Sequence, residues 1–281
     1  MLSEKFSQIS TLAAKAAIAS TALATLGVLA GAASANNVIY QDNFSGSSTL
    51  GTLNGAAPTV DNGTSATWTV ATGTGFADSG YTSYSDGNGS SAYLNFKPVS
   101  GFVYTLSAGL NMISGLDSGT ANSNNDWLAI GFLANPSSTA RFDNGTASGP
   151  GAYAWASVRG PGFQNYGNVF GGPGTNGFGE GYANAGGASG GVNNISIVLN
   201  TGQNAWTFQV FDDGTSVSPV EVFPTNPAII AVGLANNGSV TDGQFSNFEL
   251  SSSPVPEPAA LGLFGVGGGY LLMLKRRRRA V

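Results

Sequence analysis

The 281-residue chain contains no cysteine and no histidine. The absence of cysteine excludes disulfides, thiol nucleophiles and thiolate metal sites, so packing and hydrogen bonds alone must hold the fold. The absence of histidine excludes a Ser-His-Asp triad and the usual zinc and copper ligand sets, which need imidazole. Large classes of hydrolase and metalloenzyme are therefore excluded before any motif is considered.

Basic residues are also scarce once the two ends of the chain are set aside. Seven of the 10 Lys and Arg residues lie before residue 36 or after residue 253, which leaves Lys97, Arg141 and Arg159. Only Glu4 and Glu257 of the 15 acidic residues lie in those ends, so three cations meet 13 acids and the formal charge of the body is −10. Such a surface repels polyanions and has no basic patch that could release their counterions, so nucleic acid is not expected as a partner.

Residues 1–35 have the pattern of a secretory signal peptide. Two lysines precede an apolar stretch over residues 16–30, and small residues follow it at the positions that signal peptidase reads, Ala33 and Ala35. A buried structural helix is the weaker interpretation, because the stretch has no polar face and stands at the extreme N-terminus. We expect cleavage after Ala35 and export of the rest.

The C-terminal segment, residues 254–281, has three parts. Pro256-Glu257-Pro258 disfavours helix and leaves an extended peptide. The apolar run 259–274 would span roughly 24 Å as a helix, less than a hydrocarbon core of about 30 Å, so we expect a transient transmembrane helix. A basic cluster stays on the cytoplasmic side of such a span, and here it consists of Lys275, Arg276, Arg277, Arg278 and Arg279. Physical chemistry alone leaves open a plain anchor and a removable sorting signal.

Val255-Pro256-Glu257-Pro258, the apolar span and the arginine cluster together resemble the PEP-CTERM sorting signal of Gram-negative bacteria. The resemblance covers only the stretch from about Val255 to Val281. It implies an inner-membrane intermediate, recognition by an exosortase (a membrane transpeptidase), removal of the tail, and delivery to the cell surface or extracellular matrix. Bacteria with such signals commonly make exopolysaccharide, so the resemblance also implies a biofilm setting.

The body, residues 36–253, is read as many short strands separated by Gly, Asn and Asp turns, with no sustained helical periodicity. The clearest alternation predicts a buried face made of Phe102, Tyr104, Leu106, Ala108 and Leu110. Residues 126–133 form a near-continuous apolar run, which is typical of a central strand. Other strands are expected at 37–44, 66–71, 152–159, 195–199, 205–211, 217–223, 228–235 and 245–250. The pattern predicts an all-β fold, a single antiparallel β-sandwich that is jelly-roll-like.

Two features of the body have both a structural and a functional interpretation. The Gly-rich insert 160–191 carries aromatic residues that could stack on sugar rings or could pin the insert to the sandwich; the candidates for glycan contact are Tyr166, Phe170 and Tyr182. The four tryptophans stand in strand patterns, so each is expected in the core: Trp68, Trp127, Trp155 and Trp206.

Stretches of the last third of the body resemble the closing strands of concanavalin A-like or laminin-G-like jelly rolls. They are residues 206–214, 229–234 and 245–250, and the resemblance rests on pattern more than on signature residues. It implies a fold whose members often bind glycans and sometimes calcium. No set of their functional residues maps onto this chain.

Carboxylates are the remaining candidates for chemistry. Asp126, Asp143, Asp212 and Asp213 could bind calcium, although Asp-Asp-Gly before a strand is more simply a turn. Glycoside hydrolysis needs two carboxylates about 5–10 Å apart, and the available glutamates, Glu180, Glu221 and Glu249, lack the close spacing of jelly-roll glucanases. We therefore expect no enzyme and no firm cofactor. The leading hypothesis is an exported protein with a structural or adhesive role in the matrix; the alternative is an exopolysaccharide-binding protein, and the third is a polysaccharide-degrading enzyme.

Overall fold

The computed structural model describes residues 36–71, 75–82, 90–114, 127–134, 152–159, 167–168, 191–237 and 242–255. These residues form strands, turns and irregular segments, so the predicted all-β class is confirmed. Within these ranges no helix is long and apolar enough to cross a membrane. The predicted signal peptide, and all of the sorting segment except Pro254 and Val255, lie outside the described residues; Pro254 is the last residue of a strand and belongs to the body.

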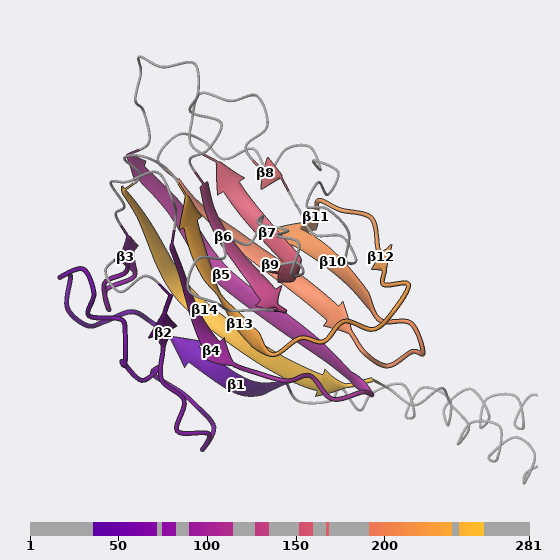
Figure 1. Ribbon diagram of the computed structural model, residues 1–281. Helices are drawn as coiled ribbons and strands as arrows, with labels where there is room; N and C mark the ends of the chain where they lie inside the picture. Colours follow the sequence, from indigo (N-terminus) through magenta and orange to yellow (C-terminus); the bar gives the residue numbers. More distant parts are fainter. Residues whose placement is uncertain are drawn as a thin grey trace, which may run out of the picture. The chain divides into compact units, whose positions relative to one another are not determined.

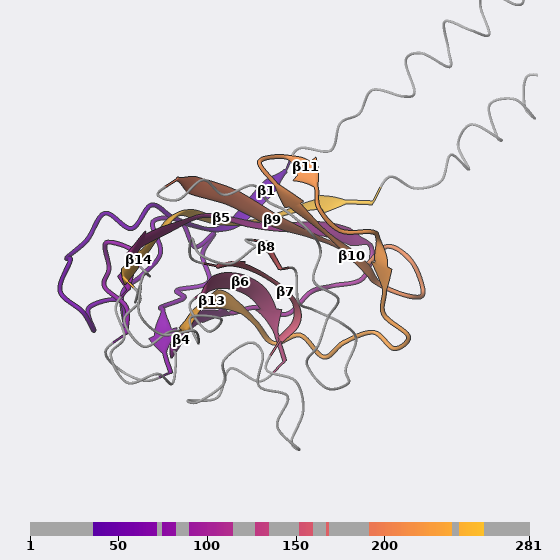
Figure 2. The same ribbon diagram turned by 90° about the horizontal axis from the view of Figure 1, so that it is seen from above.

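The strands form two antiparallel sheets (Figure 1). Sheet A has the order β1-β14-β5-β9-β10-β11, with β12 beside β10 and β3 beside β14, and sheet B has the order β2-β4-β13-β6-β7-β8. Their bounds are β1 (Asn37–Asp42), β2 (Thr69–Val70), β3 (Tyr81–Thr82), β4 (Ser90–Asn95), β5 (Phe102–Ser114), β6 (Trp127–Leu133), β7 (Ala152–Arg159), β8 (Gly167–Asn168), β9 (Val192–Asn200), β10 (Thr207–Asp212), β11 (Thr215–Ser216), β12 (Glu221–Val222), β13 (Ala231–Asn237) and β14 (Asp242–Pro254). Seen from above, the two sheets lie one over the other as a sandwich (Figure 2).

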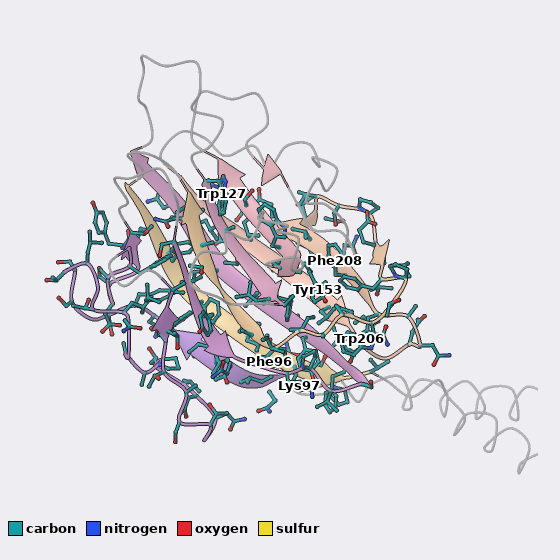
Figure 3. The ribbon with its side chains drawn as sticks, in the orientation of Figure 1. Phe96, Lys97, Trp127, Tyr153, Trp206 and Phe208 are labelled. Atoms are coloured by element: carbon teal, nitrogen blue, oxygen red, sulfur yellow. The ribbon has the colours of Figure 1, made fainter. Side chains whose placement is uncertain are left out.

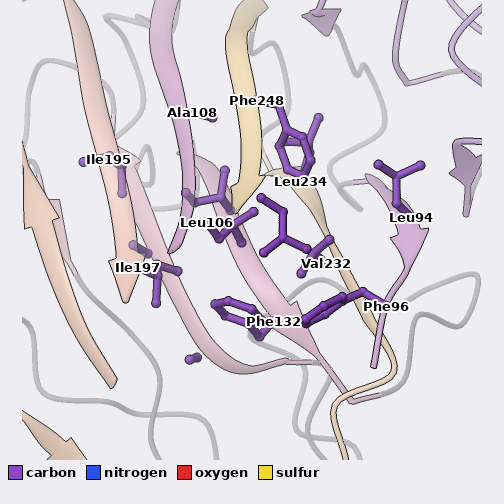
Figure 4. Close-up of a cluster of buried hydrophobic side chains, with 14 of the residues drawn as sticks. Leu94, Phe96, Leu106, Ala108, Phe132, Ile195, Ile197, Val232, Leu234 and Phe248 are labelled. Atoms are coloured by element: carbon purple, nitrogen blue, oxygen red, sulfur yellow. The ribbon is translucent and has the colours of Figure 1, made fainter. Parts of the chain in front are cut away.

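The core lies between the two sheets (Figure 4). Leu106 and Ala108 of β5 face it together with Ile195 and Ile197 of β9, because alternate residues of a strand point to the same side. Sheet B supplies the facing side chains, which include Leu94, Phe132, Val232 and Leu234. The predicted alternation in β5 is confirmed from Tyr104 to Leu110, whereas Phe102 at the start of the strand is only half-buried.

Strand β6 is buried along its whole length, as predicted for a central strand. Leu128 and Phe132 belong to the sandwich core, so the alternating residue Trp127 faces away from it. Trp127 packs on Trp155 with ring centroids 5.7 Å apart, in a second apolar cluster on the outer face of sheet B. The expectation that all four tryptophans are buried in a core is confirmed, but in two clusters: Trp68 and Trp206 lie between the sheets, whereas Trp127 and Trp155 lie in the second cluster on the opposite face of sheet B.

The strand that returns after the β10 turn is interrupted. The sequence pattern predicts one strand over 217–223, but the structure has two short strands here, β11 and β12. Between them, the Ser218 hydroxyl accepts the N–H of Val210 at 2.9 Å, where a regular ladder would offer a carbonyl, and Pro219 has no N–H to donate. An interrupted edge strand of this kind also hinders pairing with another chain.

The strand register defines two ends of the sandwich. Asn37 pairs with Ser252, and the Val255 N–H donates to Gly101 O at 2.9 Å, so both ends of the described body leave from one end. At the opposite end Ser114 pairs with Asp242, and Trp127 pairs with both Asn237 and Arg159. We call this second end, defined by Ser114, Trp127, Arg159, Asn237 and Asp242, the distal end.

Candidate functional site

Buried polar residues gather at the distal end, on top of the apolar core. The five that face inward there are Thr82, Ser90, Asn193, Asp212 and Asn236, each less than one-tenth exposed. Figure 3 places Trp127 at this end and Phe96, Lys97 and Trp206 toward the other. A polar group in such a position destabilises the fold unless it finds a hydrogen-bond partner, so the partners of these residues separate structural groups from candidates for binding.

Asn236 of β13 is a structural residue. Its side chain is fully buried; Oδ1 accepts the Ser90 N–H at 2.9 Å, and Nδ2 donates to Thr82 Oγ1. Thr82 Oγ1 in turn donates to Gly75 O at 2.7 Å. Because β13 belongs to sheet B and β3 to sheet A, this chain of hydrogen bonds ties the two sheets together.

Asp212, the last residue of β10, is different. Its side chain faces inward like those of Phe208 and Val210 and is 8% exposed, yet its Oδ1 is buried without a hydrogen-bond partner. Burial raises the pKa of this carboxyl above its ordinary value, and the nearby charge of Asp213 raises it further. An unsatisfied buried acceptor is the feature expected where a ligand supplies the missing donor.

Asn193 of β9 lies next to Asp212 on the inner face. Asp212 pairs with Ile195, so Asn193 occupies the diagonal position on the neighbouring strand, with Cβ atoms roughly 7 Å apart. Asn193 is 6% exposed. Its amide can donate and accept, whereas an ionised carboxylate only accepts, so the two side chains together can hold a group that does both, such as a hydroxyl.

Asp213 points away from this pair. Its Oδ1 accepts the Asn194 side-chain N–H at 2.6 Å, on the outer side of sheet A. Asp213 and Gly214 have φ angles of 47° and 75°, which identify the predicted tight turn as one with two left-handed residues. Asp212 and Asp213 therefore do not converge on one cation, and among the described residues no three His, Cys, Asp or Glu side chains are grouped to hold a metal.

Glu221 and Glu249 do not form a catalytic pair. They lie on β12 and β14, which the sheet order separates by β10, β9 and β5. Four strand spacings of about 4.8 Å put them roughly 19 Å apart, well beyond the separation that glycoside hydrolysis requires. Glu180, the third glutamate considered, lies outside the described residues.

Asp42 is a second buried carboxylate, but its oxygens have donors. Oδ2 accepts the Trp68 indole N–H at 2.6 Å, and Oδ1 accepts the Phe44 N–H at 2.9 Å. Burial raises the pKa of Asp42, while these two hydrogen bonds oppose the rise. We interpret Asp42 as a structural residue that holds Trp68 in place.

Most residues proposed from the sequence lie outside the described ranges. They are Ala33, Ala35, Asp126, Asp143, Tyr166, Phe170, Tyr182, Pro256, Glu257, Pro258 and the cluster Lys275 to Arg279, and their roles stay predictions. The sequence interpretation does not include Asn193, although the pattern of its strand indicates it. Every second residue after Asn193 is a core residue, namely Ile195, Ile197 and Leu199, so Asn193 is a polar residue at a core position.

No protein-family model and no curated protein match the chain. Among solved structures, a Lotus tetragonolobus seed lectin is 10% identical with a TM-score of 0.43, over 70% of this chain and 96% of that one. The endo-1,3-beta-glucanase of Streptomyces sioyaensis is 12% identical with a TM-score of 0.42, over 78% and 97%. A sialidase is 13% identical with a TM-score of 0.41; the match covers 65% of this chain but only 16% of the sialidase. Superpositions at this level are partial and carry no information on ligand or reaction.

Proposed function

We propose that this chain is an exported, non-catalytic β-sandwich protein that binds carbohydrate at its distal end. The observation that carries the proposal is the buried Oδ1 of Asp212, which has no hydrogen-bond partner and lies beside Asn193. Sugar hydroxyls both donate and accept, which matches a carboxylate next to an amide. Binding residues at one end of a rigid scaffold, where its strands give way to connecting segments, are a common arrangement.

The charge of the body narrows the class of carbohydrate. With three cations against 13 acids, the body repels anionic polymers and offers few partners for sulfate or carboxylate groups. We therefore propose a neutral glycan. The separation of Glu221 from Glu249 favours binding over hydrolysis, because glycoside hydrolysis needs two carboxylates close together.

The test of the site replaces one carboxylate at a time in the purified full chain. We expect Asp212→Asn to weaken binding of a neutral oligosaccharide about 10- to 100-fold, because hydrogen bonds to charged groups contribute about 1.5–3 kcal/mol. The matched control Asp213→Asn makes the same charge change one residue away, on the other side of the strand. Because the Asp213 charge raises the pKa of Asp212, its removal favours the ionised Asp212, so the affinity should not fall. Affinities measured by calorimetry, after a glycan array has selected the oligosaccharide, check this. Equal affinities of Asp212→Asn and the unchanged protein would refute the site.

The terminal segments support the exported part of the proposal. The signal-peptide pattern of residues 1–35 and the resemblance of Val255 to Val281 to a PEP-CTERM signal favour processing by signal peptidase and an exosortase. The protein would pass through the inner membrane and reach the surface or matrix of a Gram-negative bacterium, where it would contact exopolysaccharide.

Mass spectrometry of the exported protein checks the processing. We expect an N-terminus near Asn36 and a C-terminus that precedes the basic cluster Lys275 to Arg279. This cluster holds five of the 10 Lys and Arg residues of the chain, so its removal makes the product more acidic. A mature protein that still ends at Val281 would exclude removal of the tail.

A further inference from the structure

The outer face of sheet A is almost free of charge. Along β5, β9, β10 and residues 244–253 of β14, the only charged side chain at an outward position is Glu249. Short or uncharged polar side chains predominate there, among them Thr105, Ser107, Ser196, Asn200, Thr207 and Gln209. We call this surface of β14, β5, β9 and β10 the neutral face. The body carries 16 charged residues, three basic and 13 acidic. The low charge of this surface therefore reflects where the charged residues lie and not how many the body has.

Hydroxyl-bearing residues stand opposite each other at two places on the neutral face. Thr105 pairs with Ser251, which is only 4% exposed, and Ser107 pairs with Ser196. The next positions of these two rows are occupied by Val198, Glu249 and Phe211. Neighbouring positions are about 4.8 Å apart across the sheet and roughly 7 Å apart along each strand. Thr105, Ser107 and Ser196 are half-buried, which restricts their motion before any ligand arrives.

This arrangement suits a ligand with repeating hydroxyl groups. Short Ser and Thr side chains lose little rotamer freedom on binding, whereas Lys and Glu lose much more. Uncharged groups are also easier to remove from water than charged ones. Each contact is weak, but a polymer that spans several rows gains from their number.

We propose that the neutral face is a second carbohydrate-contact surface, which binds an extended, uncharged polysaccharide. The charges distinguish the ligand classes. Among the described residues, no cation stands at an outward position of these strands to hold an anionic polymer, and two carboxylates, Glu249 and Asp213 directly after β10, give little attraction to a cationic one. A second copy of the chain fits less well. The apolar residues of the face are separated by polar ones, whereas a stable dimer buries a contiguous apolar centre; they are Val103, Val192, Val198 and Phe211.

This inference rests on the proposed function, because it assumes a neutral glycan as ligand, but it concerns a different surface from the distal end. Thr105→Glu with Ser196→Glu places two charges in the middle of the neutral face. The control, Thr67→Glu with Ser48→Glu, makes the same two substitutions at exposed positions elsewhere. Urea unfolding of both double variants checks that each remains folded under the conditions of the binding assay.

The experiment measures retention on cellulose, dextran and mannan, and separately the affinity for a tetrasaccharide of whichever polymer binds. We expect the face variant to lose at least 10-fold in affinity for the polymer, with its tetrasaccharide affinity within twofold of normal. The control should keep both, and Asp212→Asn should lose the tetrasaccharide.

Three outcomes overturn the inference in distinguishable ways. If the unchanged protein binds neither polymer nor tetrasaccharide, the proposed function fails and this inference fails with it. If the face variant keeps its polymer affinity while Asp212→Asn loses the tetrasaccharide, only the neutral face is refuted. If light scattering shows a dimer that the face variant dissociates, the surface is an interface between two copies.

Discussion

Replacement of Trp68 by alanine is expected to lower the free energy of unfolding by about 3–5 kcal/mol from lost packing alone. The indole is 1% exposed and packs edge-on against Phe248, with ring centroids 5.0 Å apart, and obliquely against Phe44 at 6.0 Å. The substitution also removes the N–H that Asp42 accepts, and a buried acceptor left without its donor adds about 1–3 kcal/mol. The combined loss is comparable with the whole stability of an ordinary domain, about 5–15 kcal/mol.

Urea unfolding of the full chain, followed by fluorescence and circular dichroism, measures this loss. Trp68→Phe is the matched comparison, since it keeps a six-membered aromatic ring but removes the rest of the indole, including the N–H that Asp42 accepts. We expect its effect to be clearly smaller than that of alanine. Equal stability of Trp68→Ala and the unchanged protein would show that the Trp68 pocket does not contribute to the fold as described.

The contribution of Asp42 to the free energy of unfolding is expected to fall as the pH rises. Because the pKa of Asp42 is raised in the folded protein, the folded state holds this proton more tightly than the unfolded state. The contribution of Asp42 to stability is therefore largest below its ordinary value of 3.8 and is lost as pH rises through the raised folded-state pKa. The difference in stability between the unchanged protein and Asp42→Asn isolates this dependence from other carboxyl groups. A difference that grows in favour of the unchanged protein across that range would contradict the assignment.

Asn236→Leu is expected to lower the free energy of unfolding by about 2–4 kcal/mol, because it removes two hydrogen bonds from a buried site. Leucine has a similar volume, so little of the loss comes from packing. The Ser90 N–H loses its acceptor, and Thr82 Oγ1 loses the donor that links sheet B to sheet A. Urea midpoints measure the change.

A double-mutant cycle tests whether Asn236 and Thr82 act as one unit. Thr82→Val removes the other side of the bridge, so the double variant should lose less than the sum of the two single variants. Additive losses would mean that the two side chains contribute independently. Ser107→Ala, on the outer face of sheet A, is a surface control for which we expect a change within about 0.5 kcal/mol.

The chain itself determined its strands and its turns. Alternation in β5, β9 and β10 is a local signal, because successive side chains of a strand point to opposite faces. The turn at Asp213-Gly214 is equally local, since Asp and Gly tolerate the left-handed backbone angles that a two-residue hairpin needs. These signals were sufficient for an all-β class and for most of the core.

The candidate site was only half visible in the sequence. The sequence offers Asp212 with Asp213 as a possible calcium pair, but favours a turn at Asp-Asp-Gly. The structure has that turn, and the strand places one carboxylate inside and the other outside. Asn193 and Asp212 each stand at a position where the alternation of their strand predicts an apolar, inward-facing residue. A polar residue at such a position was the better signal of a site.

Only the tertiary structure decided which segments meet. Thr82 and Asn236 are bonded across 154 residues, and no local pattern indicates that β3 and β13 approach each other. Trp127 and Trp155 pack together on the outer face of sheet B, because β6 and β7 are neighbours in a register that the pattern of either strand alone does not specify. Local sequence determines which residues form strands and which face of each strand is apolar, whereas strand order and register depend on contacts between distant segments. The distal end and the neutral face are products of that order and register.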